Sequence, residues 1–457
     1  MSKLIRIRNN FSSIRFQRLS REFFWVGIGQ ALSATGAIIG VRLLTSVLSP
    51  ISYGELALGM TLAMLTQQVI FGPFAMAILR FYAPAQEARQ LPACLKAIRI
   101  LLLPPTVILL SLSLALGVVF WGLGQTVWLR LLAAATVFAL LHSFCSALSG
   151  IQNAARQRVI VAWHDGLGQW MRYFGAVVFV ILLGAFSQSA MLGFAAASAV
   201  VLISQSLFFR HKVRGMVDSQ MASQQVDIEK WTKQMQSYAM PFAVWGIFTW
   251  AQLASDRWAL KVFVDNRSIG LYAVLYQLGY YPVILLSGLM LQFITPVLFS
   301  WAGDGSDPER MVRTRRLNKA VFLGSVLLAL LGTALAFLFH RQIFSLLVAP
   351  AYQEVSSLLP VMILAGGLFA SGQAASLLLM SGLKTKRLMA PKIVTALWGV
   401  LLNFASAYWF GLRGVVFASV GFSLAYLVWI LCLARPLART ELSRREVRVG
   451  ELSGRPV

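Results

Sequence analysis

Acidic residues and cysteines are scarce in this sequence, and catalytic motifs are absent. The 457 residues include 16 Asp and Glu against 40 Lys and Arg, and only 12% of the residues are charged. Cys94, Cys145 and Cys432 lie far apart without metal-ligand spacing, which argues against a disulfide framework or a zinc site. The sequence has no phosphate-cradling glycine loop with its lysine, and no carboxylate pair at useful spacing. We therefore expect neither an enzyme nor a resident cofactor.

Apolar residues dominate the composition. Hydrophobic residues make up 58% of the chain and the mean hydropathy is +0.72, which is more apolar surface than a soluble core can bury. A net charge of +24 would suggest nucleic acid in a soluble protein, but here the basic residues fall in the short segments between apolar runs. These observations predict a multi-pass membrane protein and no nucleic-acid partner.

The apolar runs predict about twelve membrane spans of roughly 20 residues each. The first run has no small-residue cleavage site after it, so we expect an uncleaved first span. Segments assigned to the cytoplasm carry about 32 Lys and Arg and the outer loops about 5, which places both termini in the cytoplasm. The predicted spans are 23–44, 55–79, 100–121, 128–148, 159–183, 189–209, 237–263, 269–299, 318–340, 357–381, 390–410 and 413–434.

The longest internal connection is polar and divides the spans six and six. The outer loops are all short, which leaves no room for a folded domain on that side. The predicted organisation is a cytoplasmic basic amino terminus (1–22), a first lobe (23–209), a cytoplasmic linker (210–236), a second lobe (237–434) and a cytoplasmic basic tail (435–457).

The two halves share short motifs in the same order. Residues 52–57 match residues 268–273 in a Ser-x-Gly-x-x-Ala pattern, and residues 193–198 echo residues 414–419. Six spans per repeat place both halves in the membrane from the same side. We therefore expect an all-α fold of two pseudo-symmetric six-helix lobes, which can expose a central cavity to either side by rocking.

Charged residues inside the spans are candidates for a functional site, because charge in hydrocarbon is costly. Arg42 precedes Gly54 by twelve residues and Arg257 precedes Gly270 by thirteen, so the repeat places an arginine at a similar depth in the first span of each lobe. Two guanidinium groups facing one cavity would suit a pyrophosphate. Snorkelling to lipid headgroups remains an alternative for both, and it is the favoured interpretation for Lys261.

Two carboxylates also lie inside spans. Asp256 is adjacent to Arg257 and either balances its charge or couples transport to a proton or sodium gradient; charge balance is the favoured interpretation. Asp165 shares one face of the fifth span with Gln169 and Arg172. This second cluster forms either a helix–helix contact or the polar wall of a lumen.

Tyrosines recur every four residues along the eighth predicted span, at Tyr272, Tyr276 and Tyr280. Their rings can stack on sugars and their hydroxyls can form hydrogen bonds, although such a stripe is more often helix packing or an interface belt. Both interpretations remain open.

With these motifs, the chain resembles the O-antigen and polysaccharide flippases of the multidrug, oligosaccharidyl-lipid and polysaccharide (MOP) exporter superfamily over nearly its whole length. The residues that carry the resemblance are Arg42–Thr45 with Leu48–Pro50 and Tyr53–Gly54, Tyr238–Pro241, Asp256–Arg257 with Gly270–Tyr272, and Gly411–Gly414.

The resemblance implies a protein of the bacterial inner membrane that translocates a polyprenyl-pyrophosphate-linked oligosaccharide by alternating access, alongside other polysaccharide assembly proteins. Asp165 and Asp256 are the candidate residues for H⁺ or Na⁺ coupling. Lipid II flippases of the superfamily commonly have two extra carboxy-terminal spans, which argues against peptidoglycan export. The expected substrate-binding residues are Arg42, Arg172, Arg257, Lys261, Tyr276 and Tyr280.

Three other functions remain as alternatives. A cation-coupled multidrug exporter should have a more acidic or aromatic cavity than this arginine-rich one. A membrane polysaccharide polymerase or ligase is expected to carry a large outer loop with catalytic residues, which the predicted short loops do not provide. A membrane scaffold would leave the intramembrane arginines without a purpose.

Overall fold

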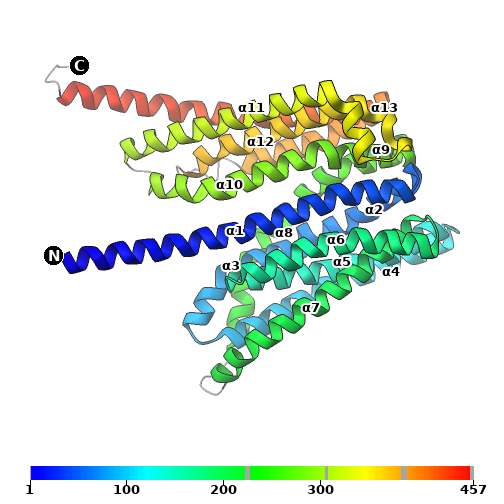
Figure 1. Cartoon of the computed structure of the whole chain (residues 1–457), viewed down its shortest axis with the longest axis horizontal. Coiled ribbons are helices and arrows are strands. Elements are labelled where there is room, and N and C mark those ends of the chain that lie inside the picture. Colours follow the sequence, from blue (N-terminus) through cyan, green and yellow to red (C-terminus); the bar gives the residue numbers. More distant parts are fainter. Residues whose placement is uncertain (1, 222–226, 304–306, 382–388, 453–457) are drawn as a thin grey trace. The chain divides into compact units, whose positions relative to one another are not determined.

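The computed structural model describes residues 2–221, 227–303, 307–381 and 389–452, and all regular elements in these ranges are helices (Figure 1). Residues 222–226 of the predicted linker and 453–457 of the predicted tail lie outside the described residues. The side chains of the predicted basic segment 1–22 lie outside them too.

Within the described residues, ten helices are long and apolar enough to cross a membrane. The last of these covers both predicted spans 390–410 and 413–434, which are two helices that meet at a kink at Gly411, where φ is 58° and ψ is −140°. The predicted span 237–263 lies in a helix that carries charges at both ends and is not among the ten. The all-helical multi-pass architecture confirms the predicted fold class.

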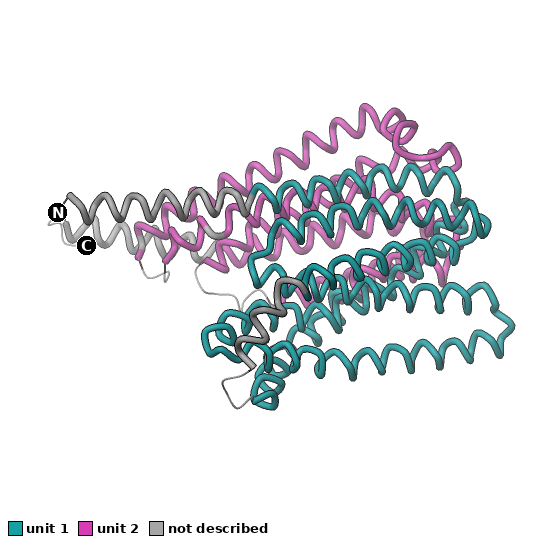
Figure 2. The backbone as a smooth tube through the Cα atoms, turned by 60° about the horizontal axis from the view of Figure 1, so that its bottom comes forward, with its two compact units in different colours: residues 1–250 teal, residues 251–457 magenta. Residues whose placement is uncertain are grey.

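By their internal contacts, residues 1–250 and 251–457 form two compact units (Figure 2). Unit 1 contains α1 (Ser2–Val47), α2 (Pro50–Leu65), the π-helix η1 (Thr66–Phe71), α3 (Gly72–Glu87), α4 (Leu91–Gly122), α5 (Thr126–Ala154), α6 (Arg158–Leu183), α7 (Ser187–Met221) and the first part of α8 (Ile228–Phe263). Unit 2 contains the rest of α8, α9 (Asn266–Leu275), the π-helix η2 (Tyr276–Tyr280), α10 (Tyr281–Ala302), α11 (Pro308–Leu347), the 3₁₀-helix η3 (Pro350–Leu358), α12 (Leu359–Ser381) and α13 (Met389–Leu452).

The division between the units differs from the predicted linker, because it falls inside α8, after Trp250. The first part of α8 packs in unit 1, where Trp231 and Met235 join the core of α3, α4 and α5. Trp231 also donates from Nε1 to Gln90 Oε1 at 2.9 Å, and Trp250 donates to the Thr61 carbonyl at 2.9 Å. Residues 237–250 thus belong to unit 1 by contact, although hydropathy predicts a break before them.

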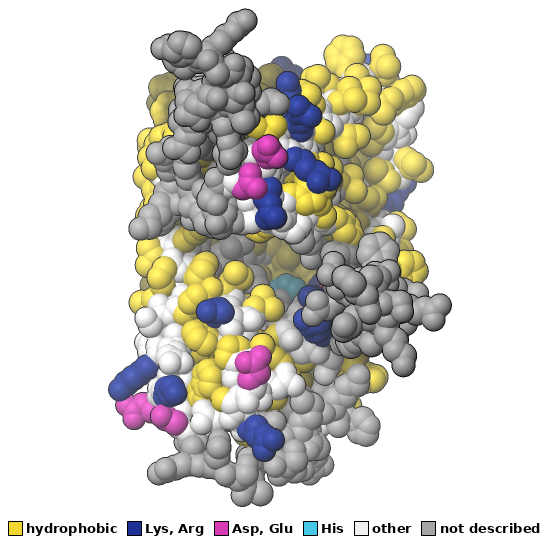
Figure 3. All heavy atoms as spheres, turned by 90° about the vertical axis from the view of Figure 1, so that its left-hand side faces the viewer, with side chains coloured by type: hydrophobic (Ala, Val, Ile, Leu, Met, Phe, Trp, Pro, Cys, Tyr) yellow, Lys and Arg dark blue, Asp and Glu magenta, His cyan; other side chains and the backbone are white. Residues whose placement is uncertain are grey.

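Charged side chains lie mainly at the ends of helices, and apolar side chains cover their flanks. In Figure 3, Lys, Arg, Asp and Glu gather on the face toward the viewer, with hydrophobic side chains along the sides. Exposed basic residues of unit 1 include Arg80, Arg89 and Lys96, which lie near the ends of α3 and α4. Charged helix ends and apolar flanks are the arrangement expected of a protein that spans a bilayer.

The Ser-x-Gly-x-x-Ala motif begins a helix in each unit. Ser49 caps α2 by accepting a hydrogen bond from the Ser52 amide at 3.2 Å, and Asp265 caps α9 by accepting one from the Ser268 amide at 2.7 Å. Both caps satisfy a backbone donor that the first helical turn leaves without a partner. The repeated motif therefore encodes a repeated helix start.

A π-helical turn follows the motif in each unit, 14 residues after Ser52 at Thr66 and 8 residues after Ser268 at Tyr276. The Gly72 amide donates to the Gln67 carbonyl and the Tyr281 amide to the Tyr276 carbonyl, five residues back in each case. A proline follows each wide turn, at Pro73 and at Pro282. Because proline has no amide hydrogen, the regular helical ladder is already broken there, and the wide turn accommodates the break.

The helices α6 and α7 of unit 1 approach closely through glycine. A side chain at Gly193 would collide with the backbone of Gly175 and Ala176, and one at Gly175 would lie 2.9 Å from the Gly193 carbonyl oxygen. Small residues at helix contacts are the usual means of close packing in membranes. This contact fixes α6, which carries Arg172, against α7.

Replacing Gly193 by alanine is therefore expected to destabilise unit 1 by about 1–3 kcal/mol, since the added methyl group must push two backbones apart. Thermal unfolding followed by tryptophan fluorescence in detergent would show a lower Tm. Gly27→Ala is the matched control, because nothing lies within 4 Å of that position and the change raises helix propensity. Equal Tm values for both variants would contradict this account of the contact.

Candidate functional site

Arg172 opens onto a cavity of about 200 Å³ inside unit 1. The cavity lies among α2, η1, α5, α6 and α7, so its wall is built by segments far apart in the sequence. Its lining combines one cation with amide, imidazole, thioether and aromatic groups. The lining residues are Met60, Ala63, Met64, Gln67, Gln68, Phe138, His142, Gln169, Arg172, Tyr173 and Phe194.

The Arg172 side chain is positioned by two neighbours. Its Nη2 donates to Gln169 Oε1 at 2.6 Å, one turn earlier on α6, and its Nη1 lies 3.1 Å from His142 Nδ1 on α5. A guanidinium has no acceptor, so His142 accepts through Nδ1 and carries its proton on Nε2. The imidazole stacks on Phe138 with ring centroids 5.4 Å apart and an interplanar angle of 11°. The cation is thus held in a defined place by neutral groups.

The π-helix η1 supplies the polar part of the opposite wall. Gln67 and Gln68 both line the cavity, and the buried Oε1 of Gln67 has no hydrogen-bond partner among the described residues. A side chain at Gly246 of α8 would collide with the Gln68 carbonyl, so the glycine lets α8 pack directly against the wide turn. Wide turns of this kind are frequent at functional sites.

Asp165 belongs to a different polar cluster of unit 1. Its Oδ1 accepts a hydrogen bond from Ser149 Oγ at 2.9 Å, and Ser149 in turn accepts one from Gln205 Nε2 at 2.9 Å. Gln205 also donates to Gln152 Oε1 at 2.9 Å. Among the described residues, Ser149 is the sole hydrogen-bond donor to Asp165. The sequence predicts that Asp165 and Arg172 share one face of this helix. In the structure, each of the two side chains has its own hydrogen-bond partners.

In unit 2, Asp256 and Arg257 form a buried ion pair. Asp256 Oδ1 accepts from the Arg257 amide at 2.6 Å and from its Nη1 at 3.2 Å, while Oδ2 accepts from the Tyr272 hydroxyl at 2.8 Å. Arg257 is 7% exposed and Asp256 4%. The guanidinium also donates to the Leu253 carbonyl and lies 4.9 Å from the centre of the Tyr276 ring. Asp256 is thus paired with Arg257, and the choice between charge balance and ion coupling for Asp256 stays a prediction.

The tyrosine stripe lies along α9 and η2 in unit 2. Tyr276 and Tyr280 stack with ring centroids 5.1 Å apart, and Tyr280 is 7% exposed. Tyr272 is 1% exposed and its hydroxyl is 3.4 Å from Ser419 Oγ on α13. The stripe is packed in this unit, and its predicted role in sugar binding stays a prediction.

The remaining predicted site residues are not among those that line the Arg172 cavity. Arg42 is half-buried in α1, one turn before the helix ends, and is not among the residues that line this cavity. Lys261 is half-buried near the end of α8 and donates from Nζ to Asn266 Oδ1 at 2.8 Å, at the start of α9. The roles of Arg42, Lys261 and Arg257 in substrate binding stay predictions.

Sequence reasoning missed Gln67, Gln68 and His142. Each is a polar residue inside a predicted apolar span, and that is the signal by which they could have been found. In the described part of the chain, no group of three or more His, Cys, Asp or Glu is placed to hold a metal ion. Arg172 and the amides of Gln67, Gln68 and Gln169 offer a cation and hydrogen-bonding groups to a ligand in this cavity.

No protein-family model and no curated protein matches this sequence. Solved structures do match in fold. An inward-facing multidrug resistance MATE-family transporter of the MOP superfamily superposes with a TM-score of 0.67 at 16% identity, covering 92% of this chain and 99% of that one. Lipid II flippase MurJ, in an inward closed conformation, superposes with a TM-score of 0.65 at 13% identity, covering 90% and 87%. The chain therefore has the all-helical, multi-pass fold of the MATE transporters and of lipid II flippase MurJ.

Proposed function

We propose that this protein is a flippase that moves a polyprenyl-pyrophosphate-linked oligosaccharide across the bacterial inner membrane by alternating access. The Arg172 cavity is the observation that carries the proposal. Arg172 is half-buried inside a predicted span, where a charge is costly unless it serves a function, and a guanidinium binds phosphate oxygens through paired hydrogen bonds. Arg172 is the proposed ligand of the pyrophosphate, with the lipid tail remaining in the bilayer.

The small volume of the cavity favours a ligand that is only one part of a lipid-linked headgroup, such as the pyrophosphate. Pockets for drug-sized molecules usually measure about 300–1,000 Å³. At about 200 Å³, the Arg172 cavity is smaller than these and suits part of a headgroup. Gln67 adds an amide whose oxygen has no hydrogen-bond partner in the described structure. Sugar hydroxyls are donors that this oxygen can accept.

A cation-coupled multidrug exporter is the second candidate. Met60, Met64, Phe138 and Phe194 line the same cavity, and thioether and aromatic side chains adapt to varied apolar ligands. The MATE structures that share this fold are named as multidrug transporters. Arg172 disfavours this reading, because it would repel the cationic drugs that a cation-coupled exporter takes.

Gradient coupling is proposed through Asp165 rather than Asp256. Asp256 is already engaged by Arg257 and by the Tyr272 hydroxyl, and its charge is balanced in place. Asp165 has one hydrogen-bond donor, Ser149, among the described residues and no ion-pair partner within 4 Å there. A carboxylate with spare acceptor capacity can take up a proton or a sodium ion.

Reconstitution into proteoliposomes separates the two functions. We expect the wild-type protein to move a polyprenyl-pyrophosphate-linked oligosaccharide from the outer to the inner leaflet, measured as protection of the glycan from an added glycosidase. Ethidium should not be transported under the same conditions. An imposed proton or sodium gradient should change the rate if the coupling is correct. Ethidium transport with no protection of the glycan would support the exporter instead.

A further inference from the structure

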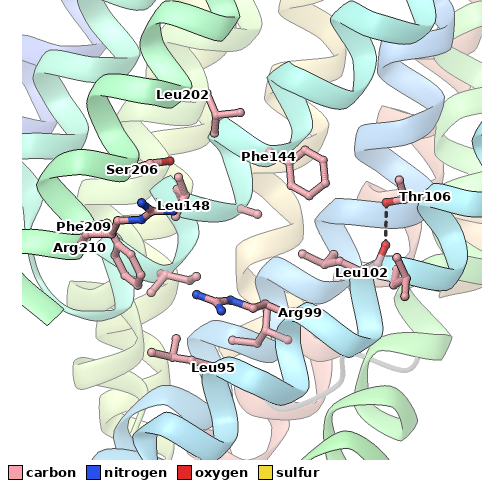
Figure 4. A pocket seen from close by; sticks show the side chains of 14 residues that line it. Leu95, Arg99, Leu102, Thr106, Phe144, Leu148, Leu202, Ser206, Phe209 and Arg210 are labelled. Carbon is pink, nitrogen blue, oxygen red and sulfur yellow. Dashed lines mark hydrogen bonds between the residues drawn. The ribbon is translucent and has the colours of Figure 1, made fainter. Parts of the chain in front are cut away.

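A second cavity of unit 1 lies among α4, α5 and α7 and shares no lining residue with the Arg172 cavity. Its volume is about 430 Å³. Most of its lining is apolar, including Leu102, Phe144 and Ile151, and its two charged residues are Arg99 and Arg210. In Figure 4 these two arginines reach into the cavity from α4 and α7 and point toward one another.

Two prolines of α4 lie at one edge of the cavity lining. Pro104 and Pro105 interrupt the helix, and neither can donate to the helical ladder. Before them α4 buries seven residues against its neighbours, from Leu91 to Leu102; after them it buries only Leu109 and Gly117. Thr106 lies just beyond the prolines and turns its hydroxyl to the Leu102 carbonyl at 2.7 Å (Figure 4). The α4 wall of the cavity therefore belongs to the well-packed end of the helix, from Leu95 to Thr106, with the prolines at its far edge.

The groove has the polarity of a lipid molecule. Arg210 ends the apolar part of α7, and Arg99 lies just before the predicted span 100–121, so both cations sit at the membrane surface. The apolar lining continues from Arg99 to Thr106, which at 1.5 Å per residue is about 10 Å into the bilayer. Leu103 is 63% exposed, so the groove borders the surface that faces lipid.

In the described part of the chain, the two arginines have no anionic partner. Among the described residues, neither Arg99 nor Arg210 forms a hydrogen bond or an ion pair, and both are exposed. A pair of cations above an apolar groove at the membrane surface complements a phosphate headgroup joined to an acyl chain. We propose that this groove is a binding site for an anionic phospholipid, with its phosphate between Arg99 and Arg210 and its acyl chain against Phe144 and Leu148.

This site is separate from the proposed transport site, so its occupant is a resident lipid and not the transported molecule. The test uses full-length protein in phosphatidylcholine nanodiscs that contain phosphatidylglycerol with a photoreactive acyl chain. We expect crosslinks to peptides of α4, α5 and α7 in the wild type. Arg99→Ala with Arg210→Ala should reduce them roughly tenfold or more, because two basic contacts at the surface are lost.

Arg80→Ala with Lys96→Ala is the matched control, since both residues are exposed basic groups of unit 1 that do not line the cavity. Leu148→Trp fills the apolar part while both arginines remain, and it should also abolish the crosslinks; it serves as the decisive variant if the double alanine variant does not fold. Unchanged crosslinking in Leu148→Trp, or equal loss in the control, would overturn the proposal. Displacement of the lipid by inorganic phosphate alone would overturn it too, by showing that the site takes a free anion. None of these readouts depends on transport.

Discussion

Arg172→Ala is expected to lower translocation of the lipid-linked oligosaccharide about 10–100-fold in proteoliposomes, with little change in protein abundance. A hydrogen bond to a charged group contributes about 1.5–3 kcal/mol, and the pyrophosphate would lose its guanidinium partner. Gln169 and His142 contact Arg172 and also line the cavity. Both are neutral groups, so the loss of the guanidinium leaves no unpaired charge on them. The measurement is the initial rate of glycan protection at several substrate concentrations.

Two further variants make this result specific. Arg172→Lys keeps the charge but loses the paired geometry, so we expect an intermediate rate. Arg130→Ala removes the same charge from an exposed position of α5 outside the cavity and should transport normally. Normal transport by Arg172→Ala would show that Arg172 does not bind the substrate, and the proposed function would lose its main support.

Arg257→Ala is expected to destabilise unit 2 by about 3–5 kcal/mol. It leaves Asp256 as an uncompensated charge in a site where only 4% of the residue is exposed. The remaining Tyr272 hydroxyl cannot balance a full negative charge. Thermal unfolding in detergent, followed by tryptophan fluorescence, would show a large fall in Tm.

A double variant tests the physical reason. Arg257→Met with Asp256→Leu removes both charges and keeps apolar volume, so it should recover much of the lost stability. If the double variant is as unstable as Arg257→Ala, the loss comes from packing and not from the isolated carboxylate. If the double variant is stable but inactive in transport, the Asp256–Arg257 pair has a role in transport beyond its contribution to stability.

The spans could be predicted from sequence because each apolar run must satisfy its own backbone as a helix. The hydropathy profile, however, detects only the part of a helix that lies in the hydrocarbon core. The span predicted at 318–340 lies in α11, which begins at Pro308, capped by Asp307, and ends at Leu347. The predicted linker is likewise mostly helical, because α7 continues to Met221 and α8 begins at Ile228.

The candidate site was less accessible to sequence reasoning. Arg172 could be found because a charge inside an apolar run stands out. His142 and Gln67 could not be joined to it, because α5 and η1 meet α6 through packing between distant segments. The separation of Asp165 from this group also depends on Ser149 and Gln205, which lie on other helices. A local sequence pattern does not show which distant residue a polar side chain will contact in the folded protein.

The two π-helical turns have a consequence for the rotational phase of the second and eighth spans. Each wide turn absorbs about one residue more than a regular turn, and one residue corresponds to about 100° around an α-helix. The side chains of α3 after Gly72, and those of α10 after Tyr281, therefore face directions that an unbroken helix would not give them. A one-residue deletion within either turn would close it to a regular turn and leave the rest of that span facing the same neighbours, whereas the same deletion elsewhere in the span would rotate the part beyond it by about 100°.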